Sequence, residues 1–91
     1  MIASPVVAVN RAAAVAHARG PEAGLALLED IGPQGGLDGF EPYWVARADL
    51  CARLGDNEAA RRAYDLAIGL QTDPAARAFL VERVGTLAKP Q

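Results

Sequence analysis

The stretch RLGDNEAARRAYDLAIGL, Arg53–Leu70, decides the fold, because it reads as the end of one helix, a glycine stop and a second helix. Gly55 is expected to end the first helix, and Asp56 or Asn57 is expected to cap the second. The second helix carries small residues along one face, at Ala60, Ala63 and Ala67. Two helices approach closely only where neither presents a bulky side chain. The stretch therefore predicts a tightly packed helical hairpin.

The composition of the 91-residue chain is that of one small folded domain. Hydrophobic residues make up 52% of it, which excludes an intrinsically disordered protein. The formal net charge is −2, and no basic stripe provides the clustered cations that nucleic-acid binding needs. The sequence has neither a signal-peptide pattern nor the ~20 apolar residues of a membrane span. We expect a cytoplasmic protein that contacts neither nucleic acid nor membrane.

Start and stop signals divide the chain into five predicted helices and no strand. We expect a first hairpin over about 4–31, a loop over 32–41, a second hairpin over about 42–70, and a capping helix over about 73–88, all within one domain of residues 1–91. Ser4 and Asp73 are expected to cap helices, because each precedes a proline that suits the first helical turn. Gly32 is expected to stop the second helix, since glycines and prolines follow it.

A shift of 36 residues superposes the first hairpin on the second. It places Arg11 on Arg47, Ala12 on Ala48 and Glu22 on Glu58. Two helices in a unit of about this length are typical of tetratricopeptide repeats, whose units have about 34 residues. Trp44 falls at the first aromatic position of that pattern. The sequence therefore predicts an all-α, tetratricopeptide-like helical hairpin repeat of two hairpins and a C-terminal capping helix.

A DNA-reading helix-turn-helix is the main alternative for Arg53–Leu70. Its second helix would need an apolar residue six positions after Gly55 in order to seat on the core, and Arg61 stands there. Together with the acidic charge balance, Arg61 argues against DNA reading.

A groove for a partner protein is expected where the first helices of successive hairpins lie side by side. Its candidate partner-binding residues are Val9, His17, Val45, Asp49 and Arg53. Such a groove takes an extended or helical segment of a partner. With only two hairpins, the groove could instead be shallow and partly filled by the fifth helix, and the sequence leaves both alternatives open.

No catalytic residue, cofactor site or metal site is predicted, so we do not expect an enzyme. His17 has no cysteine or carboxylate at ligand spacing on its helix face. Cys51 falls on the packed face, where a buried thiol behaves as a small hydrophobe. Arg11 and Arg47 hold equivalent places in the two hairpins, and we expect them to bond chain ends or the neighbouring repeat rather than a partner.

Five segments resemble the helical C-terminal extension found on one group of extracytoplasmic-function RNA polymerase sigma factors. In order they are SPVVAVNRAAAVA at Ser4–Ala16, RGPEAGLALLE, LDGFEPYWVARADLCARLG, EAARRAYDLAIGL and ARAFLVER, and they cover nearly all of residues 4–87. The resemblance implies a tetratricopeptide-like regulatory domain that acts through protein contacts. It maps the recurring polar positions of the family onto Asn10, Arg11, Arg47, Asp49, Arg77 and Arg83.

The resemblance also implies a bacterial, non-enzymatic role in the control of transcription initiation, with sigma-factor core regions or RNA polymerase as partners. Both promoter-reading regions of that family are missing from this sequence, so the chain alone would not direct polymerase to a promoter. The alternative is a free-standing tetratricopeptide adaptor or small-ligand sensor unrelated to transcription. A homodimer through the open ends of the repeat is a further alternative.

Overall fold

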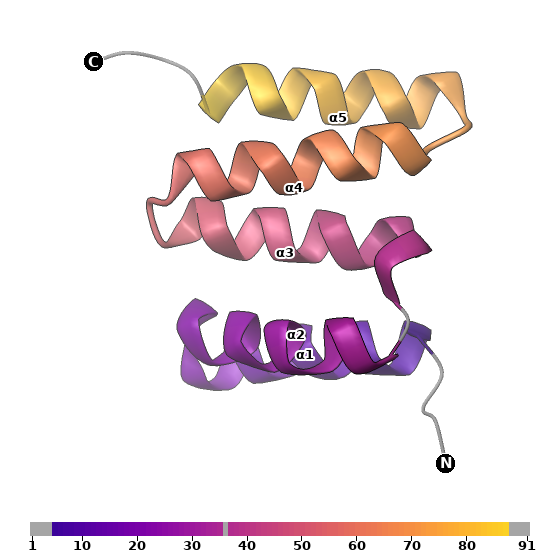
Figure 1. The fold of residues 1–91 in the computed structure, drawn as a ribbon. Helices are drawn as coiled ribbons and strands as arrows, with labels where there is room; N and C mark the ends of the chain where they lie inside the picture. Colours follow the sequence, from indigo (N-terminus) through magenta and orange to yellow (C-terminus); the bar gives the residue numbers. More distant parts are fainter. Residues whose placement is uncertain (1–4, 36, 88–91) are drawn as a thin grey trace.

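Five α-helices and one short 3₁₀ helix form the part of the chain that the computed structural model describes, residues 5–35 and 37–87. They are α1 (Pro5–Arg19), α2 (Pro21–Gly35), η1 (Leu37–Gly39), α3 (Glu41–Arg53), α4 (Asn57–Leu70) and α5 (Pro74–Leu87). These residues contain no strand. The predicted all-α fold of two hairpins and a fifth helix is confirmed (Figure 1). No helix in the described ranges has the length and apolar character needed to cross a membrane.

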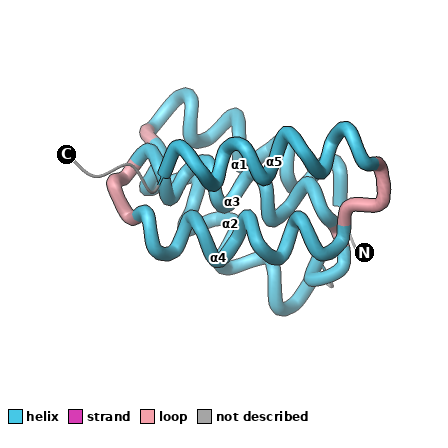
Figure 2. The backbone as a smooth tube through the Cα atoms, turned by 90° about the horizontal axis from the view of Figure 1, so that it is seen from above, coloured by secondary structure: helices cyan, strands magenta, loops and turns pink. Residues whose placement is uncertain are grey.

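The helices stack along one direction, with the first hairpin at one end and α5 at the other (Figure 1). Seen from above, α1, α3 and α5 lie towards one side of the stack, and α2 and α4 lie towards the other (Figure 2). The principal extents of 42, 30 and 18 Å describe an elongated, flattened molecule. The first helices of successive units therefore share one face, as a hairpin repeat requires.

The first hairpin is held together by close packing of small residues. Ala8, Ala12 and Ala16 are the buried residues of α1, and Gly24 of α2 faces them. A Cβ on Gly24 would lie 2.5 Å from the Cβ of Ala16 and 2.8 Å from the carbonyl oxygen of Ala12. Only glycine allows this approach. The turn between the helices is made by Gly20, whose φ of 101° disfavours any side chain.

The second hairpin follows the local signals of its sequence. Gly55 has a φ of 83° in the turn, and the Asp56 carboxylate accepts a hydrogen bond of 3.1 Å from the N–H of Ala59. Ala48 and Ala60 are fully buried where α3 and α4 meet. The 36-residue shift therefore holds in the packing, since it pairs the buried Ala12 with Ala48.

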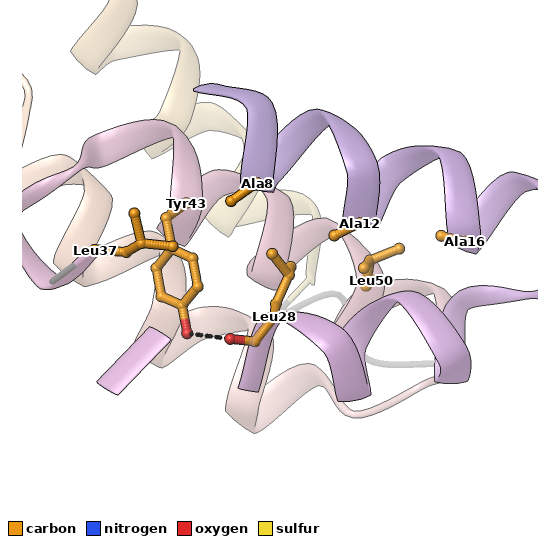
Figure 3. Packing of buried hydrophobic residues seen from close by; sticks show 7 residues of the cluster. All are labelled: Ala8, Ala12, Ala16, Leu28, Leu37, Tyr43 and Leu50. Atoms are coloured by element: carbon orange, nitrogen blue, oxygen red, sulfur yellow. Dashed lines mark hydrogen bonds between the residues drawn. The ribbon is translucent and has the colours of Figure 1, made fainter. Parts of the chain in front are cut away.

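Tyr43 of α3 joins the second hairpin to the first. Its side chain is 1% exposed, and its hydroxyl donates a 3.0 Å hydrogen bond to the carbonyl of Leu28 in α2 (Figure 3). The phenol also lies against Gly32, where an added Cβ would overlap it. The sequence pattern had favoured Trp44 for the aromatic position. Trp44 is only partly buried, and its indole N–H donates to the Asp38 carbonyl at 2.8 Å.

The predicted helix stop at Gly32 and the predicted loop over 32–41 are wrong. The helix α2 continues through Gly32 to Gly35, η1 occupies residues 37–39, and α3 begins at Glu41. Because Gly32 has no side chain, Tyr43 can pack against the helix there. This tertiary contact outweighs the low helix propensity of glycine.

The fifth helix begins as predicted, with the Asp73 carboxylate accepting a 3.0 Å hydrogen bond from the N–H of Ala76. Leu80 is buried, and Val84 and Leu87 pack beside it against residues of α3 and α4. The predicted cap at Ser4 and the last predicted helical residue, 88, lie outside the described residues.

Replacing Gly24 with alanine tests the close approach of α1 and α2. We expect Gly24→Ala to lower the free energy of unfolding by roughly 1–3 kcal/mol, because the added methyl group overpacks the hairpin. The matched control is Gly85→Ala in α5, where a Cβ would meet no atom within 4 Å. The control should instead raise the free energy of unfolding by about 0.5–1 kcal/mol. Urea unfolding measures both variants, and two stabilising substitutions would contradict this packing.

Candidate functional site

An open groove with a volume of about 510 Å³ lies between α3 and α5. Its lining side chains include Val45, Ala46 and Asp49 of α3, Tyr64 of α4, and Phe79, Leu80 and Arg83 of α5. Most of these side chains are apolar, and the charged ones among them are Asp49 and Arg83. The groove can therefore accept apolar groups and orient them through a few polar contacts.

A smaller hollow of about 180 Å³ lies between α1 and α3. His17 of α1 lines it together with Asp49 and Arg53 of α3. Ala46 and Asp49 line both hollows, so the two adjoin along α3. We call them together the inner groove.

The inner groove brings together four of the five candidate partner-binding residues. His17, Asp49 and Arg53 line the smaller hollow, and Val45 lines the larger one. Val9 lines neither hollow, because it packs against the core cluster between the two hairpins. The groove was predicted between α1 and α3, which is where the smaller hollow lies, and the lining residues of that hollow belong to these two helices. Helix α5 instead forms one wall of the larger hollow.

Asp49 holds two arginines where the two hollows of the inner groove adjoin. Its carboxylate oxygens lie 3.0 Å from Nη2 of Arg53 and 3.4 Å from Nη2 of Arg83. The Arg83 guanidinium carbon also lies 5.6 Å from the ring centroid of Phe79 and 6.0 Å from that of Tyr64. Cation–π contacts of this kind hold the guanidinium against the groove wall.

Sequence reasoning missed Phe79 and Leu80 as groove residues, because it assigned the fifth helix to a cap. A signal was available in the arginines, since Arg11, Arg47 and Arg83 follow one another at the same spacing of 36 residues. That spacing places α5 where the first helix of a third unit would lie. The helix accordingly contributes to the same face as α1 and α3.

The remaining polar positions lie outside the inner groove. Arg47 of α3 contacts Glu29 of α2 at 3.3 Å and donates a 3.1 Å hydrogen bond to the Tyr43 hydroxyl. Arg47 thus bonds the neighbouring repeat, as predicted. Three further positions that the resemblance maps are exposed and line neither hollow of the inner groove: Asn10, Arg11 and Arg77.

A third hollow of about 310 Å³ lies on the opposite face, between α2 and α4, and Cys51 lines it. The thiol is free and buried. Burial raises the pKa of the Cys51 thiol above its ordinary value, and the nearby Arg47 only partly offsets this. Within residues 5–35 and 37–87, no group of three or more His, Cys, Asp or Glu side chains is placed to hold a metal ion.

Comparison with known proteins finds similarity to an uncharacterized protein of Rhizobium meliloti (strain 1021), with 41% identity over 85 residues. The alignment covers 93% of this chain and 20% of that protein. The chain thus spans about a fifth of the length of the relative it matches. No family model and no solved structure matches the chain.

The buried Cys51 should react slowly with thiol reagents in the folded protein. The reactive species is the thiolate, and burial both raises the thiol pKa and limits access. At pH 8 we expect reaction with Ellman's reagent to be slower than in the urea-unfolded chain by on the order of ten-fold or more. Equal rates in the folded and unfolded protein would contradict the placement of Cys51.

The raised pKa of the Cys51 thiol also makes the free energy of unfolding depend on pH. The folded protein holds the thiol proton more tightly than the unfolded chain does. This contribution to the free energy of unfolding is therefore complete below the ordinary pKa of 9.0 and falls as the pH rises above it.

Proposed function

We propose that the chain is a regulatory protein-interaction domain of a bacterial sigma factor and acts without catalysis. The observation that carries this proposal is the inner groove, an open and largely apolar surface on a helical hairpin repeat. Its parent protein is inferred from the resemblance of segments such as SPVVAVNRAAAVA, Ser4–Ala16, to sigma-factor extensions. The match to one fifth of a longer protein is compatible with a domain of a larger chain.

The proposed partner is a core region of the sigma factor or the RNA polymerase that it recruits. A segment of this partner would lie along α3, with its apolar side chains on Val45 and Leu80. Burial of apolar surface stabilises such a contact by about 25 cal/mol per Å². Docking of this segment would favour one arrangement of the domain relative to the sigma core. Release of the segment would shift the equilibrium towards other arrangements.

The proposed setting follows from that partner. Transcription takes place in the bacterial cytoplasm, where the domain would act. Promoter DNA would be read by other regions of the sigma factor, since this chain has a net charge of −2 and carries no basic stripe.

A free-standing adaptor or small-ligand sensor is the second candidate. The specific observation in its favour is the size of the larger hollow, about 510 Å³, because pockets for small molecules commonly have about 300–1,000 Å³. Such a protein would bind a peptide or metabolite and would not bind a sigma factor.

Direct binding to purified partners tests the proposed function. The chain is titrated with the promoter-reading core regions of a sigma factor that carries this extension, and separately with RNA polymerase from the same organism. We expect saturable binding to at least one of them in isothermal titration calorimetry. Binding to neither partner would overturn the assignment to a sigma factor.

A pair of variants locates the contact on the inner groove. Val45→Arg places a charge among the apolar lining residues, and we expect binding to weaken by roughly ten-fold or more. Val81→Arg is the matched control, because Val81 is 54% exposed on α5 and does not line the inner groove. Equal weakening by the two variants would place the contact elsewhere.

A further inference from the structure

Charge is distributed unevenly along the inner groove. At the beginning of α3, the Glu41 carboxylate accepts a 3.0 Å hydrogen bond from the side-chain amide of Gln71. Towards the end of α3, Asp49 lies between the guanidinium groups of Arg53 and Arg83. One carboxylate therefore faces two arginines, and this part of the groove carries an excess of one positive charge.

Both arginines retain hydrogen-bonding capacity for a ligand. A guanidinium has five N–H donors, and each of these two directs Nη2 at Asp49. The side chains remain 59% exposed for Arg53 and 44% exposed for Arg83. Donors that are not used on Asp49 thus belong to side chains that remain partly exposed to solvent.

The position of Arg83 is fixed in advance of binding. Its guanidinium lies over the rings of Phe79 and Tyr64, and Asp49 anchors one of its nitrogens. A side chain that is already ordered loses less conformational entropy when a ligand binds. A planar guanidinium held in this way is suited to a carboxylate, which it can contact through two N–H groups.

We propose that the inner groove binds a partner segment that places an acidic side chain beside Asp49, on the remaining N–H groups of Arg53 and Arg83, and apolar side chains on Val45, Phe79 and Leu80. This inference rests on the proposed role of the groove as a protein-binding surface, but it does not depend on the sigma factor. The added carboxylate balances the second arginine. A basic side chain at the same place would face two guanidinium groups and only one carboxylate, which is already paired.

Three matched peptides test the charge preference. They are short, blocked at both ends and labelled with fluorescein, and they share a sequence of Leu, Val and Ser apart from two adjacent positions that are Glu, Gln or Lys. Fluorescence anisotropy measures their binding to the full chain. We expect the Glu peptide to bind about ten-fold more tightly than the Gln peptide, which corresponds to about 1.4 kcal/mol, and the Lys peptide to bind most weakly.

Three variants assign the preference to its residues. Arg53→Gln and Arg83→Gln should each remove most of the difference between the Glu and Gln peptides. Arg77→Gln is the control, because Arg77 is exposed on α5 outside the inner groove and its loss changes the net charge equally. Arg53 lies at the exposed end of α3, so Arg53→Gln keeps the test valid even where Arg83→Gln weakens the packing of α5.

The outcomes separate this inference from the proposed function. Similar affinities for the three peptides, tighter binding of the Lys peptide, binding of none of them, or full retention of the Glu preference in both arginine variants would overturn the inference. If the sigma core regions still bind in any of these cases, the proposed function stands. A Glu preference that depends on Arg53 and Arg83 supports the inference, even if no sigma region binds.

Discussion

The contact of Tyr43 with α2 is the interaction on which the rest of the structure depends. The phenol fits against the helix because Gly32 has no side chain, and its hydroxyl donates to the Leu28 carbonyl. Trp44 extends the contact, with its ring edge-to-face to that of Tyr43 at a centroid distance of 4.9 Å. Full burial of an aromatic side chain stabilises a fold by a few kcal/mol. Tyr43 therefore fixes the second hairpin on the first.

The shape of the inner groove depends on the packing of Tyr43 against α2. Helix α3 contributes residues to both hollows, so the orientation that Tyr43 gives α3 determines where Val45 and Asp49 point. The ion pair of Asp49 with Arg83 then ties α5 to α3 across the larger hollow. Small residues within each hairpin, the Tyr43 contact between the hairpins and the ion pair of Asp49 with Arg83 thus together shape the inner groove.

The sequence predicts the features that depend on neighbouring residues. Gly55, Asp56 and Asp73 act in turns and caps as expected, because their chemistry is local. It does not predict Gly32 or Tyr43 correctly, since a glycine that accommodates a distant side chain has the same local pattern as a helix stop. Adjacent aromatic residues raise a similar problem, because the rotation of α3 about its axis decides which one is buried. In the groove, His17, Val45, Asp49 and Arg53 were predicted. The contribution of α5 was missed, although the 36-residue spacing of its Arg83 from Arg47 indicated it.

Native-state hydrogen exchange of Tyr43→Leu tests most directly whether this contact couples the two hairpins. In the unaltered protein, the slowest amides of α1 and α2 should share one opening free energy with those of α3 and α4, because the hairpins open as one unit. In Tyr43→Leu, which keeps apolar bulk but loses the hydroxyl and the ring, we predict two separate opening free energies. A single shared value in the variant would contradict the account.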